Sequence, residues 1–162
     1  MHHGAIMVGG FLGTLISLEK ILPLKKRVLF AIPVMSGISV LFFFAAMPVV
    51  AWSCLVVASL GLSAVFLHYF FCERSLVYLL MLSGGISWVI GNVVLISEQF
   101  YPLAFPWWLG FALFVITSER VELTKFLPVS NTMKAILVAL LALFAIGVTM
   151  SFHGNGSFIS GA

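Results

Sequence analysis

Three histidines and a methionine near the ends of this sequence have the chemistry to bind haem or copper. His3 and Met7 are four residues apart, so on a helix they share a face and could offer imidazole and thioether ligands to one ion. His153 could join them if the first and last helices are neighbours. His2 points elsewhere, because successive side chains on a helix are rotated by about 100°. From spacing alone, solvated histidines are the simpler interpretation, and no HExxH or CxxCH motif supports a metal site.

The fourth histidine, His68, lies inside an apolar run. It shares a helical face with Gly61 and Ala64, and small residues mark close contacts between helices in a membrane. We therefore expect His68 to point into a helix bundle. A hydrogen bond to a backbone carbonyl and a proton-handling or cofactor role are both compatible with that position.

Trp88 and Asn92 are polar groups inside another apolar run. They are four residues apart, so the indole N–H and the amide could face one polar cavity. Gly84, Ser87 and Gly91 form a stripe of small residues beside them, which permits tight packing against a helix or a flat ring. We favour packing, because asparagine in a helix bundle commonly bonds to a neighbouring helix.

The elements that position these residues belong to a chain too apolar for a water-soluble domain. Of 162 residues, 62% are hydrophobic and 8% are charged, whereas a soluble domain carries about 25% charged residues. The mean hydropathy is +1.22. The composition predicts an integral membrane protein. The net charge of +3 comes from 8 basic and 5 acidic residues, too few and too scattered for binding to nucleic acid.

Charges and turn-forming residues divide the chain into six apolar spans. A helix needs about 20 residues to cross the hydrocarbon core, and the spans predicted on that basis are 4–22, 28–47, 49–71, 75–96, 103–118 and 133–152. A tight hairpin at residues 46–48 separates the second span from the third. We therefore predict an all-α fold, a polytopic transmembrane helix bundle formed by a single domain over residues 1–162.

All basic residues fall on one side of this six-span topology. They are Lys20, Lys25, Lys26, Arg27, Arg74, Arg120, Lys125 and Lys134. The positive-inside rule makes this side cytoplasmic and places both termini outside. Four aromatic residues form a belt near the opposite ends of the spans, as Trp and Tyr do at membrane interfaces; they are Trp52, Tyr101, Trp107 and Trp108.

The short first span and the final loop indicate that the chain is part of a longer membrane protein. Only fifteen uncharged residues separate Gly4 from Glu19, counting Gly4 itself, and the residues from His153 onward are typical of a loop that leads to another helix. As partners we expect the lipid bilayer, further transmembrane helices or a homo-oligomer, and no nucleic acid.

Two segments that run from the outer to the inner side match at an offset of 100. Residues 10–21 and 110–121 share glycine, phenylalanine, isoleucine, acidic, basic and aliphatic positions. The match predicts that the first and fifth spans are equivalent positions in a parallel four-helix repeat; a chance match of short apolar segments is the alternative. The charged run from Glu119 to Lys125, which begins within the second of these segments, is interpreted as the solvated end of a helix.

Several of these segments resemble the bacterial NnrS-like membrane proteins. They are residues 3–20, His68, Trp88 with Asn92, and residues 111–120, and together with their surroundings they cover about half of the chain in short patches. Members of that family are polytopic, are described as containing haem and copper, and are linked to nitric oxide stress. The resemblance implies a bacterial cytoplasmic (inner) membrane location and makes His3 the match to a histidine-rich helix start. The offset-100 match would then correspond to the helix arcs of haem-copper oxidases, to which the family is thought to be distantly similar.

We therefore expect a polytopic membrane protein that binds haem or copper and takes part in nitric oxide or respiratory redox chemistry. The candidate ligands are His3, Met7 and His153, and His68 is a further cofactor-binding candidate. The first alternative is part of a small-solute transporter in which Gly84, Gly91 and Asn92 line a midplane site. A helix-packing subunit without a site of its own is the second alternative.

Overall fold

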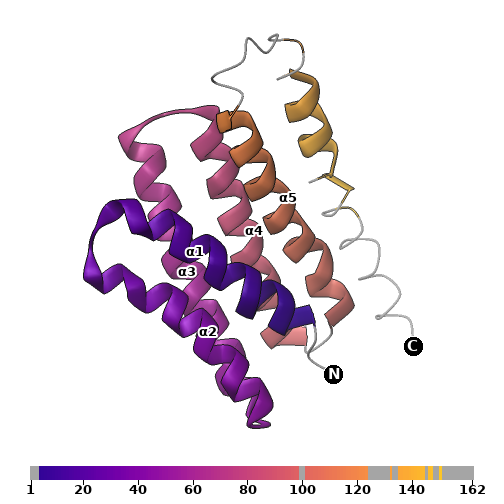
Figure 1. Cartoon of the computed structure of the whole chain (residues 1–162). Helices are drawn as coiled ribbons and strands as arrows, with labels where there is room; N and C mark the ends of the chain where they lie inside the picture. The colour runs from indigo at the N-terminus through magenta and orange to yellow at the C-terminus, as the bar shows by residue number, and fades with distance from the viewer. Residues whose placement is uncertain are drawn as a thin grey trace.

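The chain folds as a set of helices, as the predicted all-α class requires (Figure 1). The computed structural model describes residues 4–98, 101–123, 132, 135–144, 146–147 and 150. Within these residues, five helical segments are long and apolar enough to cross a membrane. A shorter apolar helix, Ala135–Phe144, lies within the predicted sixth span.

The first two segments are composite, and the next three are single helices. The first joins a π-helix, η1 (Ala5–Leu12), to α1 (Gly13–Ile21) and a short 3-10 turn, η2 (Leu22–Leu24). The second joins η3 (Arg27–Phe30) to α2 (Ala31–Phe44). The remaining helices are α3 (Pro48–Cys72), α4 (Leu76–Glu98) and α5 (Tyr101–Leu123).

Five of the six predicted spans coincide with these segments to within a few residues. The largest difference is at the end of the fifth span, where α5 continues five residues beyond the predicted end at 118. Its last residues are charged or aliphatic side chains that favour a helix, and no glycine or proline stops it. Whether the sixth span crosses the membrane stays a prediction, because much of it lies outside the described residues.

The predicted hairpin between the second and third spans is confirmed. Two residues after the end of α2, Ala46 lies in the left-handed region, at φ 57°. The N–H of Met47 donates to the Phe42 carbonyl at 3.0 Å, and that of Ala46 to the Phe43 carbonyl at 3.3 Å. This pairing closes the last turn of a helix and satisfies its free carbonyls. Pro48 then begins α3, because its fixed φ and missing N–H suit the first helical position.

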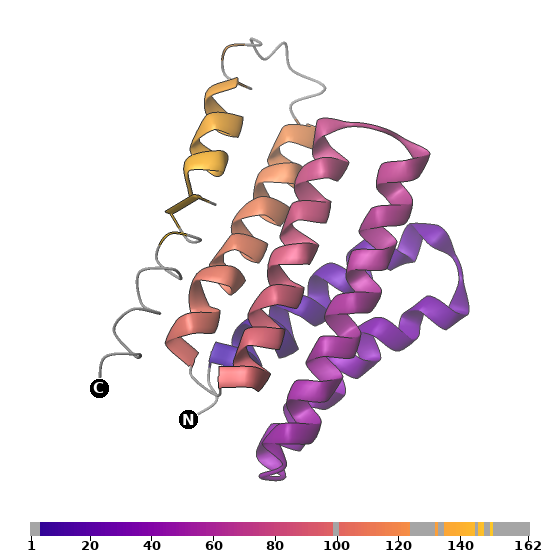
Figure 2. The same cartoon turned by 180° about the vertical axis from the view of Figure 1, so that it is seen from behind.

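Helices α3, α4 and α5 lie side by side, with α2 next to α3, and the first segment crosses in front of this row (Figures 1 and 2). Glycines on the crossing segment let it approach closely: a Cβ added at any of three of them would lie within 3 Å of a side chain from another helix. These contacts are Gly9 with Leu55 of α3, Gly10 with Val40 of α2, and Gly13 with Trp88 of α4.

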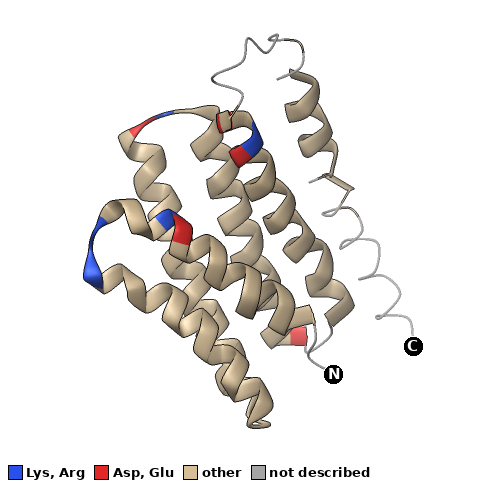
Figure 3. Ribbon diagram, in the orientation of Figure 1, with Lys and Arg blue, Asp and Glu red and all other residues tan. Residues whose placement is uncertain are grey.

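The positive charges lie on one side of the bundle, as Figure 3 shows. The described lysines and arginines lie in the turns from α1 to α2 and from α3 to α4, and at the last turns of α1 and α5. Because successive helices reverse direction, all of these positions fall at the same end of the bundle. We call this the basic end. The α2–α3 hairpin and Glu98, the last residue of α4, lie at the opposite end.

Candidate functional site

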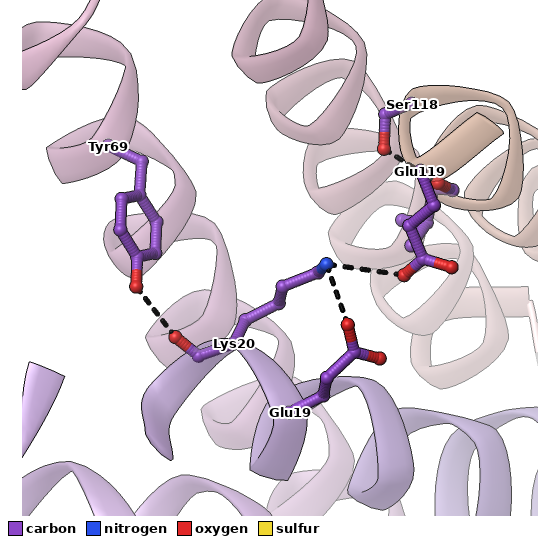
Figure 4. A network of polar contacts seen from close by, with 6 residues as sticks. Glu19, Lys20, Tyr69, Ser118 and Glu119 are labelled. Atoms are coloured by element: carbon purple, nitrogen blue, oxygen red, sulfur yellow. Dashed lines mark hydrogen bonds and ion pairs between the residues drawn. The ribbon is translucent and has the colours of Figure 1, made fainter. Parts of the chain in front are cut away.

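A lysine held between two carboxylates joins the first and fifth segments at the basic end (Figure 4). The Lys20 Nζ lies 2.9 Å from Glu19 Oε1 and 3.3 Å from Glu119 Oε1. The Lys20 side chain is only 12% exposed, whereas Glu119 is 34% exposed. A buried charge is costly unless it is paired, so the carboxylates are what allow this ammonium group to lie inside the bundle.

Two further helices hold the backbone of Lys20 in place. The Tyr69 hydroxyl of α3 donates to the Lys20 carbonyl at 2.8 Å (Figure 4). That carbonyl is among the last four of α1, which have no partner within a helix that ends there. The Tyr69 ring in turn stacks on Tyr78 of α4, with ring centroids 5.6 Å apart. Four helices therefore converge on the Lys20 cluster, which consists of Glu19, Lys20, Tyr69 and Glu119.

The Lys20 cluster brings together the ends of the two segments that match at an offset of 100. Both segments run toward the basic end, and the acid of the second pairs with the base of the first. The interpretation of Glu119 as part of a solvated helix end therefore missed its ion pair with Lys20. The offset-100 match was the signal that could have located this pair, since it placed both residues at the same depth. The four-helix repeat itself stays a prediction.

A second polar contact lies in the interior, between α3, α4 and α5. The Trp108 Nε1 donates to Asn92 Oδ1 at 3.1 Å, and the Asn92 Nδ2 donates to the Leu55 carbonyl at 3.3 Å. Asn92 is 2% exposed and Trp108 is 1% exposed. The indole that shares a contact with Asn92 is therefore that of Trp108, and not that of Trp88 as the four-residue spacing suggested.

Trp88 is fully buried where α1, α4 and α5 meet. Its ring stacks on Phe111 of α5, with centroids 4.7 Å apart, and also faces Gly13 of α1. Neither its Nε1 nor the buried Ser17 Oγ of α1 has a hydrogen-bond partner among the described residues. Trp88 therefore fills the space between three helices by ring contacts alone.

The small residues of α4 form the contact with α5. A Cβ added at Gly84 would lie 3.0 Å from Val115, and one at Gly91 would lie 2.8 Å from Trp108. The Ser87 hydroxyl donates to the Trp107 carbonyl at 2.7 Å. Side chains of α5 thus occupy the space beside the stripe, so the structure places these residues in helix packing.

Of the four candidate cofactor ligands, the structure describes Met7 and His68. Met7 lies in the π-helix η1 and is 50% exposed. His3 and His153, like His2, lie outside the described residues. Among the described residues, no group of three or more His, Cys, Asp and Glu side chains is arranged to hold a metal ion.

The prediction that His68 points into the bundle is wrong, because its side chain is exposed. The face of α3 that is buried at this level carries Val65 and Phe66. Of the two small residues used for the prediction, Gly61 does contact α2, but Ala64 is exposed. His68 also lies at the basic end, beside Tyr69, while Met7 is more than three turns before Lys20. His68 and Met7 therefore cannot bind the same ion.

Side-chain hydroxyls satisfy carbonyls along the π-helical segment. Ser36 of α2 donates to the Gly9 carbonyl at 2.7 Å, and Thr14 donates to the Gly10 carbonyl. Ala5, Gly9 and Gly10 are buried on the side of η1 that faces the bundle. Met7 therefore projects from a backbone that other residues hold in place.

The chain belongs to the family described as "Domain of unknown function (DUF8744)", whose model matches residues 1–162. No curated protein and no solved structure matches the chain. The family description names no activity or ligand.

Proposed function

We propose that this protein is a multi-pass integral membrane protein of the bacterial cytoplasmic membrane that holds haem or copper and serves nitric oxide or respiratory redox chemistry. The site is at the end of the bundle opposite the basic end, and its ligands are Met7, His3 and His153. Its partners are the lipid bilayer and further transmembrane helices or a second copy. The resemblance to NnrS-like proteins and the described surroundings of Met7 both support this proposal.

The observation that carries the proposal is the π-helix around Met7. π-helices make up well under 1% of residues in proteins and occur frequently at functional sites. Here η1 extends over eight residues. Since a wider turn is less favourable than an α-helix, a segment of this kind is expected where the side chains it presents have a task. Met7 is the side chain of η1 with metal-binding chemistry, and it is half-exposed.

The donor chemistry fits haem iron or Cu(I). A thioether and a neutral imidazole are soft to intermediate ligands that these ions accept, whereas Mg²⁺ and Ca²⁺ require oxygen ligands. The described residues supply one ligand, Met7, and the two histidines of the proposal lie outside them. The alternative of a midplane solute site receives less support, because α5 packs against Gly84 and Gly91 and both ends of the Asn92 amide are bonded.

We predict that replacing His3 with alanine abolishes bound haem or copper, and that replacing Met7 with leucine weakens the binding and shifts the haem absorption maxima. The protein is expressed with haem and copper supplied and purified in detergent, and the Soret band and the copper content are measured. His3→Ala removes one of the two proposed imidazole ligands, whereas Met7→Leu keeps the volume and removes only the sulfur.

Matched variants separate ligation from general damage. Met47→Leu removes a methionine that is 55% exposed in the hairpin at the same end of the bundle, and His2→Ala and His68→Ala remove the other histidines. All three are expected to retain wild-type haem or copper content. A wild type that contains neither, or full retention by both His3→Ala and Met7→Leu, would contradict the proposed function.

We further propose that the basic end faces the cytoplasm, so that the proposed haem or copper site faces outward. A single cysteine at Lys26 should react with an impermeant maleimide only from the cytoplasmic side, and one at Glu98 only from outside, because positive charge resists translocation. The native Cys72 is exposed and Cys54 is buried, so both are first replaced by alanine. Labelling of the Glu98 cysteine from the cytoplasm would contradict this orientation.

A further inference from the structure

A hollow of about 270 Å³ opens at the basic end between α3 and the turn that leads into α2. Its walls come from η2, η3 and the first turn of α2 on one side and from α3 on the other. Helices α2 and α3 touch deeper in the bundle, where a Cβ added at Gly61 of α3 would lie 2.8 Å from Ile32 of α2. Nearer the basic end, Leu24 of η2 and Leu29 of η3 line the hollow on one side, and Ala64 and His68 of α3 line it on the other.

The lining changes from apolar to basic along its length. Six of the eight lining residues are apolar or glycine: Leu24, Leu29, Ile32, Gly61, Ala64 and Val65. The other two are Lys26 and His68, and none of the described Asp or Glu residues lines the hollow. Along α3, His68 lies seven residues after Gly61, or about 10 Å nearer the end of the helix. Cationic and imidazole groups therefore stand at the mouth, and apolar walls extend toward the membrane interior.

We infer that this hollow is a binding site for an anionic phospholipid. The headgroup phosphate would lie against Lys26 and His68, and an acyl chain would lie along the apolar walls. The groups of a phospholipid complement this lining in order. Its anionic phosphate lies at the membrane surface, where the basic residues are, and its hydrocarbon chains lie below, where the walls are apolar. Basic pockets between transmembrane helices are a known way of recognising anionic lipid headgroups.

The charge of the surroundings favours a lipid anion over an apolar partner helix. Lys25 and Arg27 flank Lys26 in the sequence and are exposed, so they raise the positive potential at the mouth without lining it. An apolar helix docked here would offer the Lys26 ammonium group no anionic partner. The phosphodiester of a phospholipid neutralises this charge at the membrane surface.

Lipid titration followed by native mass spectrometry tests this inference on the full chain in detergent. The probes are dioleoylphosphatidylglycerol, dioleoylphosphatidylcholine and inorganic phosphate. We expect one phosphatidylglycerol to be retained more strongly than phosphatidylcholine, and Lys26→Gln to weaken its retention roughly fivefold, the effect of one basic residue at an anionic surface. Inorganic phosphate should not compete at equal concentration, because it lacks the acyl chains that the walls accept.

Two more variants test the geometry of the hollow. Lys25→Gln removes the same charge one residue earlier, outside the lining, and should weaken retention less than Lys26→Gln. Ala64→Leu leaves every charge in place but fills the apolar part, and should weaken retention as Lys26→Gln does; Ala31→Leu adds the same group at an exposed alanine outside the lining and should not. Equal retention of the two lipids, equal effects of the two lysine variants, or competition by inorganic phosphate would overturn the inference. It would also be overturned if Lys26→Gln changed the oligomeric state instead of the lipid count.

Discussion

Replacing Gly13 with alanine is expected to destabilise the bundle by about 1–3 kcal/mol, the usual cost of adding a group to a well-packed core. The added Cβ would lie 2.5 Å from two carbons of the Trp88 ring. Trp88 has no free space to move into, because it is fully buried and stacked on Phe111. The loss exceeds the gain of up to about 1 kcal/mol that alanine offers over glycine in a helix. Unfolding with a denaturing detergent, followed by tryptophan fluorescence, measures the difference.

Gly37→Ala is the matched control for this variant. Gly37 lies in α2, and the nearest atom to an added Cβ is the Thr14 Oγ1 at 3.7 Å, an ordinary contact. The same chemical change should therefore leave stability unchanged or raise it by up to about 1 kcal/mol. If Gly13→Ala proves as stable as Gly37→Ala, then α1 does not pack against Trp88 as described.

The lengths and ends of the helices could be predicted because they depend on local sequence. Apolar length sets which segments can cross a membrane, and the charged turns separate those segments. The hairpin at residues 46–48 was predictable for the same reason, since Pro48 interrupts a long uncharged run and suits the start of a helix. The one-sided placement of lysine and arginine likewise follows from counting the spans.

The faces that the helices bury could not be predicted in the same way. In a soluble protein the buried face is the apolar one, but in a membrane the outer face is as apolar as the core. On α3, for example, Leu55 and Leu62 are buried while Leu60 and Leu67 are exposed. Hydrophobic periodicity therefore carried no signal here. The orientation of His68 was therefore predicted from the small residues Gly61 and Ala64 alone, and Ala64 does not lie on the buried face.

Contacts between distant segments were the least predictable part of the candidate sites. The Lys20–Glu119 ion pair joins residues 99 positions apart, and the offset-100 match gave their common depth but not their distance. Asn92 was identified as a residue that bonds across helices, yet spacing on its own helix pointed to Trp88 instead of Trp108. Only the packing of α5 against the small residues of α4 brings the Trp108 indole to Asn92.

The contact between Asn92 and Trp108 is expected to be the strongest polar coupling in the interior. Asn92→Leu removes the acceptor and leaves the buried Trp108 N–H without a partner, which costs about 1–3 kcal/mol. Trp108→Phe removes the donor and part of the ring. Because each single change breaks the same hydrogen bond, the double variant should lose less stability than the sum of the two. The coupling should be about 0.6–1.7 kcal/mol, the range found for hydrogen bonds between membrane helices.

Trp88→Phe distinguishes this hydrogen bond from the packing of a large ring. It makes the same chemical change as Trp108→Phe at a ring that is also fully buried, but the Trp88 N–H has no partner among the described residues. Its loss of stability should therefore come from packing alone, and its coupling to Asn92→Leu should be smaller than that of Trp108→Phe. Detergent-induced unfolding of the three single and two double variants gives both couplings. Equal couplings would mean that Asn92 acts on its neighbours through volume, and that the hydrogen bond with Trp108 contributes no stability of its own.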